Sequence, residues 1–401
     1  MTSQDKGFLY DSALEHAMDL LRNPPTEKGG LPLSFTEDGI GEMATLNMLA
    51  SHVFGGAAYL DGANVLAHMD PPTPWITWAT TLWNSRLNQN LLHPATAPFA
   101  AEAETKVIDW LSPFFGMEGG HMCCGSTVAN LTALWAARDA KNVEKIVASS
   151  SAHVSIEKAA RILGLPYQQV PTNLAGQIDA DKTGDLSNTC LVLTAGTTAT
   201  GAIDSLELVD QAKWCHIDAA WAGPLRLSKK YASLLDGIEK ADSVSVSAHK
   251  WLFQPKDSAL ILFREPDMVN PVLSYAGGYL ATPNIGVQGS RGASAIPLLA
   301  TLLAWGRSGI SDRLEHAMSM AATLAAELEK DENIYLWAKP KTGVNVFRPL
   351  NMSSEELFNR LPDGMLSTCV LDNKKWLRSV AANPLADTES IVAIVRKAIS
   401  G

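Results

Sequence analysis

The chain has 401 residues, of which 46% are hydrophobic and 18% are charged, and its formal net charge is −10. The acidic balance argues against nucleic acid or an anionic membrane surface as the main partner. The longest apolar run is too short to span a bilayer, and the N-terminus lacks the basic and apolar regions of a secretory signal. Five scattered cysteines without a C-x-x-C pair argue against a zinc site and favour a reducing, cytoplasmic location.

The first 115 residues contain four helical patterns and little distinctive chemistry. Apolar spacing indicates helices at 10–21, 43–53, 75–87 and 99–115. Between the last two, His93 lies in a loop rich in hydrogen-bonding groups. It is either a site residue or a loop histidine whose ring is hydrogen-bonded within the loop, and the sequence favours neither.

A Gly125-Ser126-Thr127 turn leads directly into a strong helical pattern at 128–138. Such a turn binds anions well, because backbone N–H groups, hydroxyls and the helix dipole all face the ligand. Plain N-capping by Ser126 or Thr127 is the alternative. The stretch is not G-x-G-x-x-G and no Walker lysine follows, so it indicates neither a dinucleotide site nor a P-loop.

Strands and helices then alternate, which predicts a mainly parallel sheet with right-handed crossovers. The expected helices are 155–163 and 205–213, and the expected strands are 145–150, 189–195, 214–218, 243–247 and 258–263. A polar or charged residue follows four of these strands: His153, Thr198, Asp218 and Lys250. Because parallel strands end at one edge of the sheet, these residues should converge on one crevice.

The strand at 243–247 alternates Ser and Val and ends in Ala248-His249-Lys250-Trp251. A lysine at a strand end is a candidate nucleophile toward a carbonyl. By itself the stretch favours a lysine that only snorkels to water. The residues at the neighbouring strand ends reverse that preference.

The last part of the chain begins with a Gly-rich loop at 273–292 that contains Tyr275 and Tyr279 and is a plausible mobile lid. Apolar and amphipathic helices flank a break at 306–309, and short strands and helices follow. We expect a helical segment that packs on the large domain or on a partner subunit, a large domain, and a smaller α+β domain. These are residues 1–60, 61–308 and 309–401.

Together these residues supply the parts of a pyridoxal phosphate site. Lys250 offers an amine for the cofactor aldehyde, and Asp218 offers a carboxylate for the pyridine nitrogen. His153 offers an imidazole that can lie against a flat ring. The turn at Ser126 and Thr127 offers a phosphate site.

With these residues in place, the chain resembles the group II pyridoxal-dependent decarboxylases, which include glutamate and aromatic amino acid decarboxylases. The matching residues occur in order from about His68 to Pro384. They are Ala129-Asn-Leu-Thr-Ala-Leu, His153 with Ser155 and Lys158-Ala159, Gly196-Thr-Thr, Gly201-Ala-Ile-Asp204, His216-Ile-Asp218-Ala-Ala-Trp-Ala-Gly223, Asp242-Ser243, His249-Lys250-Trp251, Trp376-Leu-Arg378 and Asn383-Pro384.

The resemblance implies the fold-type I architecture, a homodimer, and decarboxylation of an L-amino acid to an amine and carbon dioxide through a Lys250 Schiff base and a quinonoid. Asp218 would bind the pyridine nitrogen, and His153 would stack on the ring and orient the substrate carboxylate. Further cofactor contacts are implied for Ser126, Thr127, Thr198, Ala220, Ser247 and His249.

The resemblance also implies substrate contacts. Arg378 would lie near the substrate carboxylate, with an ion pair at a domain interface as the equal alternative. The loop that holds His93 should form part of the pocket, and a lid tyrosine, Tyr279 or Tyr275, would return a proton to the α-carbon.

The chain departs from the family pattern at several positions. Cys123-Cys124 replaces Thr-Ser, Val128 replaces a glutamate, Ser247 stands where Asp or Asn is usual, and the lid is short. A carbon–carbon lyase or aldolase, an aminotransferase, and a non-catalytic homologue are the rival functions. The product of the reaction separates the three enzymes, and the intact Asp218 and Lys250 argue against the non-catalytic homologue.

Overall fold

The computed structural model describes residues 13–25, 30–31, 34 and 37–400. The chain splits into two units, Met1–Tyr59 and Leu60–Gly401. The first contains α1 (Ala13–Arg22) and α2 (Glu42–Gly55), which are linked by a 2.7 Å hydrogen bond between His16 Nε2 and Asn47 Oδ1. Both helices were expected, although the predicted start at Tyr10 lies outside the described residues.

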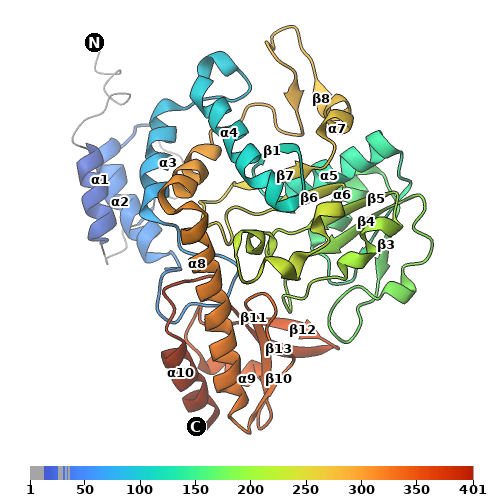
Figure 1. The fold of residues 1–401 in the computed structure, drawn as a ribbon. Helices are drawn as coiled ribbons and strands as arrows, with labels where there is room; N and C mark the ends of the chain where they lie inside the picture. The colour runs from blue at the N-terminus through green and yellow to red at the C-terminus, as the bar shows by residue number, and fades with distance from the viewer. Residues whose placement is uncertain (1–12, 26–29, 32–33, 35–36, 401) are drawn as a thin grey trace. The chain divides into compact units, whose positions relative to one another are not determined.

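A seven-stranded sheet forms the centre of the second unit (Figure 1). The strand order is β1-β7-β6-β5-β4-β2-β3, and only β7 runs antiparallel to its neighbours. The mainly parallel sheet was expected. The strands are β1 (Gly119–Cys123), β2 (Lys145–Ser149), β3 (Tyr167–Val170), β4 (Thr189–Thr194), β5 (Trp214–Asp218), β6 (Ser243–Val246) and β7 (Ala259–Phe263).

Three expectations for this region were incomplete or wrong. β1 and β3 were missed, because β1 starts with two glycines and β3 is a short, partly polar edge strand. The helix expected at 205–213 is a 3₁₀ segment, Leu206–Gln211, too short to repeat an α-helical face.

Helices cover the sheet. α5 (Ser126–Lys141) packs on β5, β6 and β7, and lies beside α6 (Val154–Leu163) (Figure 1). Its buried residues recur at helical spacing: Ala129, Asn130, Ala133, Leu134 and Ala137. Every residue of β4, β5, β6 and β7 is buried, as expected for a sheet covered on both faces.

The long helix α8 (Ala295–Glu329) bends at Gly306, where φ is 60° and ψ is −179°. The break expected at 306–309 is therefore present. α8 packs against α3 (Trp75–Leu87) and α4 (Pro98–Leu111), and also against a second, antiparallel sheet. The domain boundary expected at residue 308 stays a prediction.

The second sheet has the order β10-β11-β13-β12. Its strands are β10 (Ile334–Leu336), β11 (Val344–Pro349), β12 (Ser367–Leu371) and β13 (Lys374–Val380). α9 (Ser354–Arg360), which Ser353 caps, and α10 (Thr388–Ser400) accompany it.

The loop expected at 273–292 contains more structure than predicted. It follows α7 (Pro266–Leu273) and forms a small hairpin of β8 (Ser274–Tyr275) and β9 (Asn284–Ile285). None of the helices within the described residues is long and apolar enough to cross a membrane.

Candidate active site

The carboxyl ends of β2, β4, β5 and β6 meet at one small pocket of about 40 Å³. Six of the predicted site residues line it: Ser126, His153, Thr198, Asp218, Ala220 and Lys250. The pocket also has walls that were not predicted: Ser151, Thr194, Gly196 and Trp221. Thr194 pairs with Asp218 in the sheet register, so strand alignment alone could have suggested it.

Asp218 ends β5 and is buried at the floor of the pocket. Its Oδ2 accepts a 3.0 Å hydrogen bond from Asn130, and its Oδ1 accepts from the Ala220 backbone N–H at 3.1 Å and lies 3.3 Å from Ser245 Oγ. None of the ion pairs formed by the described residues includes Asp218. A buried carboxylate without a cation is costly, so this position suits a positively charged ligand atom.

Lys250 lies four residues beyond the end of β6. Burial lowers its pKa, an effect that Asp218 and Asp70 partly oppose and that Lys256 and Arg378 reinforce. The following residue is an anchor: the Trp251 indole donates to the Ala381 carbonyl at 3.0 Å and lies 4.0 Å from the Trp221 ring. A lysine held this way is a better nucleophile, because more of its amine is neutral at a given pH.

His153 is the N-cap of α6, and its side chain accepts from the Ser155 backbone N–H. The ring borders the pocket and is otherwise exposed. Desolvation lowers its pKa, against the opposing effect of Asp218, and nearby Lys250 and Lys158 lower it further. The ring can therefore contact a planar ligand as a neutral imidazole.

The N-terminus of α5 follows Gly125, which has φ of 153° and ψ of 161°, and no side chain caps the helix. The capping role considered for Ser126 and Thr127 is thus not observed. Instead Ser126 Oγ lies 2.6 Å from Ser247 Oγ, and Thr127 is exposed. The free N–H groups of the first helical turn make a good phosphate site.

His249 lies beside this turn. Its Nε2 is 3.3 Å from Ser247 Oγ, and its Nδ1 is 3.1 Å from the Ser258 carbonyl. Burial lowers the pKa of His249 to about 4, helped by Lys256 and Lys250. The ring is therefore neutral at pH 7, with Nδ1 donating to the carbonyl. Ser247, where the chain leaves the family pattern, thus remains bonded on both sides.

Arg378 on β13 reaches toward the pocket from the second sheet. Its guanidinium donates to the Thr198 carbonyl at 2.6 Å, the Ala67 carbonyl at 3.1 Å and Ser367 Oγ at 3.0 Å. The ion pair considered for it is not among those of the described residues. Two of its five N–H donors remain unused, so the group can still meet a carboxylate.

Three predicted residues lie apart from the Lys250 pocket. His93 and the exposed Tyr279 pack edge to face, with ring centroids 6.4 Å apart, and neither lines the pocket. Tyr275 packs on Trp135 of α5, 6.0 Å between centroids.

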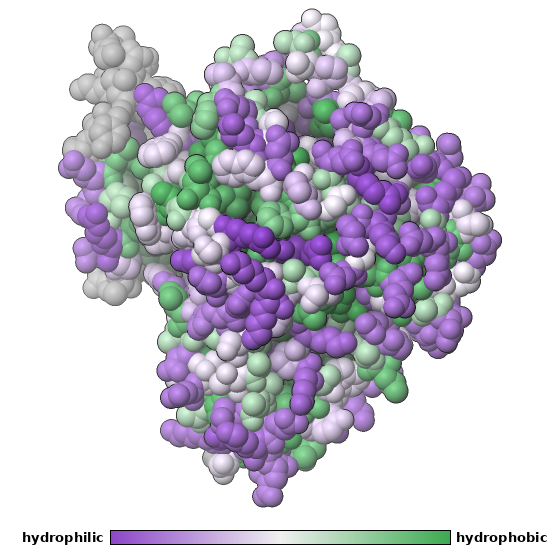
Figure 2. Space-filling model, in the orientation of Figure 1, coloured by the Kyte–Doolittle hydropathy of each residue, from purple (hydrophilic) through white to green (hydrophobic). Residues whose placement is uncertain are grey.

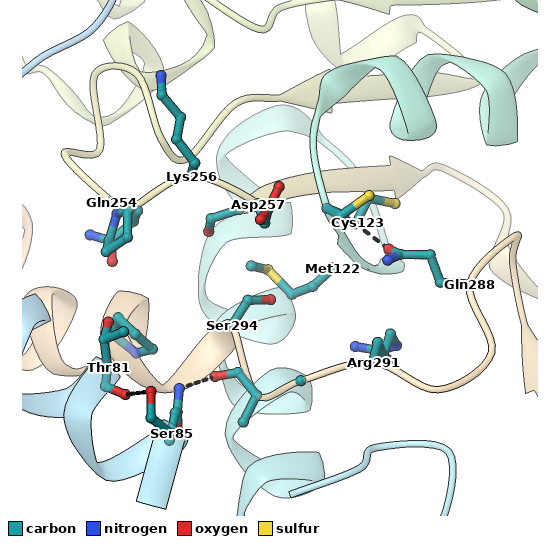
Figure 3. A pocket seen from close by; sticks show the side chains of 17 residues that line it. Thr81, Ser85, Met122, Cys123, Gln254, Lys256, Asp257, Gln288, Arg291 and Ser294 are labelled. Carbon is teal, nitrogen blue, oxygen red and sulfur yellow. Dashed lines mark hydrogen bonds between the residues drawn. The ribbon is translucent and has the colours of Figure 1, made fainter. Parts of the chain in front are cut away.

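A larger hollow of about 440 Å³ lies elsewhere in the same unit. Figure 3 shows Met122, Cys123, Gln288 and Arg291 around it, with the Lys256 side chain pointing away. The two cations that line it are already paired, Arg291 with Glu104 and Lys256 with Asp70, and its third charged residue, Asp257, is exposed to solvent. Gln288 accepts from the Cys124 backbone N–H at 2.9 Å.

Comparison with known proteins identifies the family. Residues 55–349 match the family described as "Pyridoxal-dependent decarboxylase conserved domain". The chain is similar to an aromatic-L-amino-acid decarboxylase of Bacillus atrophaeus, 28% identical, with 94% of this chain and 88% of the relative covered. It is also similar to an L-2,4-diaminobutyrate decarboxylase of Acinetobacter baumannii, 24% identical, with 98% and 92% covered.

Solved structures share the fold. The Oryza sativa TDC structure with PLP and tryptamine has a TM-score of 0.86 at 20% identity and covers 100% of this chain and 98% of its own. The glutamate decarboxylase domain structure from Vibrio parahaemolyticus has a TM-score of 0.80 at 23% identity, with 98% and 90% covered. The expected fold-type I architecture, cofactor and enzyme class are confirmed. The chain belongs to the family of pyridoxal phosphate-dependent amino acid decarboxylases.

Proposed function

We propose that the pocket around Lys250 is the site at which this enzyme decarboxylates an L-amino acid. One observation carries the proposal: a buried carboxylate without a cation, Asp218, shares a pocket with a desolvated lysine. An exposed imidazole and the uncapped start of α5 border the same pocket. This donor set fits pyridoxal phosphate, whose protonated pyridine nitrogen would supply the cation that Asp218 lacks.

Each side of the pocket then has one task. Pyridoxal phosphate supplies an aldehyde that combines with amines and a ring that accepts the electrons left when carbon dioxide departs. Lys250 would hold the aldehyde, and Asp218 would keep the pyridine nitrogen protonated. Thr198, Ala220 and His153 would contact the ring. Ser126, Thr127, Ser247 and His249 would hold the phosphate.

His153 and Arg378 orient the substrate carboxylate in this proposal. The bond that breaks is the one held perpendicular to the ring, so the position of the carboxylate selects decarboxylation over other reactions. Arg378 can serve because it retains unused N–H donors beside Thr198, a pocket residue.

We propose that the enzyme works as a homodimer. α3 exposes Trp75, Trp78 and Trp83 by 69%, 54% and 59%. Figure 2 shows apolar side chains gathered where α3 and the first half of α8 lie. Such a large exposed patch is typical of a protein interface. A dimer also gives a use to Tyr279 and His93, which would serve the partner's pocket, with Tyr279 returning the proton to the α-carbon.

The proposed substrate is an L-amino acid. The relatives are named for aromatic amino acids and for diaminobutyrate, so both classes belong in the first screen. We place the enzyme in the cytoplasm, which suits five free thiols.

The proposal is tested by loading the purified protein with pyridoxal phosphate, reducing it with borohydride, and locating the modified residue by mass spectrometry. We expect the label on Lys250 and carbon dioxide plus an amine from at least one amino acid. A 2-oxo acid would indicate the aminotransferase, and an aldehyde would indicate the carbon–carbon lyase. Failure to bind the cofactor would refute the proposal.

A further inference from the structure

A fully buried amide connects the two sides of the pocket. Asn130 on α5 donates from Nδ2 to Asp218 Oδ2 at 3.0 Å and to Ser155 Oγ at 2.9 Å. Its Oδ1 accepts from Ser245 Oγ at 2.7 Å and pairs with His216 Nε2 at 3.0 Å. These four bonds use both N–H groups and both lone pairs. The amide orientation is determined, because a flipped amide would set its oxygen against the Asp218 carboxylate.

The bond to Ser155 has a consequence for His153. Because Ser155 Oγ accepts from Asn130, its own proton is free to reach His153 Nδ1, 2.8 Å away. The Ser155 backbone N–H points at the same nitrogen from 3.2 Å. Two donors on Nδ1 make it an acceptor, so the neutral ring carries its proton on Nε2.

The oxygen of the Asn130 amide is bonded to buried residues of the core. Burial lowers the pKa of His216 to about 4, so this ring is neutral at pH 7. Its Nε2–H donates to Asn130 Oδ1, and its Nδ1 accepts from Ser243 Oγ at 2.9 Å. Ser243 in turn accepts from the Trp214 indole at 3.0 Å. Trp214, Ser243 and His216 therefore donate in one direction, toward Asn130 Oδ1.

We propose that Asn130 is a positioning residue that orients the Asp218 carboxylate and, through Ser155, holds His153 as the Nε2-protonated tautomer. The proton state of His153 is a property of the protein without cofactor, whereas its effect on catalysis rests on the proposed function. The His153 Nε2–H would donate to a negatively charged substrate group. Asp218, Lys250 and Lys158 are the charged groups that act on the ring.

The first test uses the cofactor-free protein. In ¹⁵N-histidine-labelled protein, we expect the His153 resonances, assigned with His153→Gln, to show a neutral ring with the proton on Nε2. Ser155→Ala removes the hydroxyl donor but keeps the backbone N–H, so it should raise the share of the Nδ1-protonated tautomer at His153. Asn345→Ala is the matched control, because Asn345 is an equally buried amide, in the second sheet, and it should leave His153 unchanged. A wild-type ring protonated on Nδ1, or an unchanged ring in Ser155→Ala, would overturn the proposal.

The second test uses the loaded enzyme and its pH profile. Ser155→Ala removes a donor to Nδ1, so the ring accepts a second proton more easily and the acid limb of kcat/KM should move to higher pH. We expect kcat/KM at neutral pH to fall on the order of tenfold, as for the loss of one hydrogen bond in a closed site. Asn130→Leu should lose more, because Asp218 also loses a donor.

The outcomes of the two tests separate the two proposals. If Asn345→Ala shifted the pH profile as much as Ser155→Ala, a merely structural role would explain the loss and the inference would fail. If Asn130→Leu did not fold, Ser155→Ala would still decide. A wild-type protein that bound no cofactor would refute the proposed function, while the tautomer measurement would stand or fall independently.

Discussion

Two hollows of the second unit differ in size and in chemistry. The larger, about 440 Å³, is lined by two cations that are already paired, Arg291 with Glu104 and Lys256 with Asp70, and by Asp257, which is exposed to solvent. The smaller, about 40 Å³, holds a buried carboxylate without a cation and a lysine whose pKa burial lowers. A buried charge without a counter-ion therefore marks the reactive site better than volume does.

Among the substitutions that test the difference between the two hollows, replacement of Lys250 should have the largest effect on activity. Lys250→Ala removes the amine that holds the cofactor, and we expect carbon dioxide release to fall by at least about 10³-fold. The borohydride-dependent label should also disappear. If Lys256→Ala, at the larger hollow, removed the label and Lys250→Ala did not, the assignment of the two hollows would be reversed.

Asp218→Asn should come next. The amide keeps the shape of the side chain but loses the negative charge, so the ring nitrogen is no longer held protonated and kcat should fall roughly 10²- to 10³-fold.

Asp204→Asn is the matched control, because Asp204 is equally buried but accepts from the backbone N–H groups of Ile178 and Thr194 at 2.6 and 2.8 Å. Burial raises its pKa to about 6. The amide of Asn can accept only one of the two backbone N–H bonds, so the melting temperature of Asp204→Asn should be measured together with its kcat. An equal loss of kcat in both variants would contradict a special role for Asp218.

Arg378→Met should mainly raise KM for the amino acid, by about tenfold, since a charged hydrogen bond to the substrate carboxylate is lost. Its three carbonyl and hydroxyl contacts are lost as well, so the melting temperature should be measured with the kinetics. A lower melting temperature without a change in KM would assign Arg378 to the scaffold alone.

The pH dependence of Lys250 labelling should show a smaller effect. Burial lowers the Lys250 pKa, so its amine is deprotonated at a pH where an ordinary lysine, with a pKa near 10.4, is still charged. The cofactor-free protein should therefore react with pyridoxal phosphate at Lys250 at lower pH than at exposed lysines. Mass spectrometry of borohydride-reduced samples across pH measures this, and identical pH profiles at all lysines would argue against it.

The smallest effect is expected in the larger hollow. Ser294 lines it, and its side chain does not cap α8. Ser294→Ala should leave kcat/KM within about twofold of wild type, the usual range for a substitution outside special features. A tenfold loss would show that the larger hollow takes part in catalysis.

Much of the fold was predictable from local patterns. The helix at 75–87 and the strand at 214–218 agree with the structure at both ends, because their apolar spacing or continuous burial is a local property. β1 was missed because its glycines carry no periodic signal. The antiparallel direction of β7 was also not predicted, since strand direction depends on the path of the connections rather than on the strand's own residues.

The sequence by itself determined the family, the cofactor and the order of residues at the strand ends, because short motifs and strand periods are encoded locally. Only the tertiary structure decided which of those residues meet. It placed Asn130 against Asp218, 88 residues away, tethered Arg378 to three segments, and set His93 and Tyr279 apart from Lys250. Such contacts depend on how crossovers and helix faces bring distant segments together, and that information is spread over the whole chain.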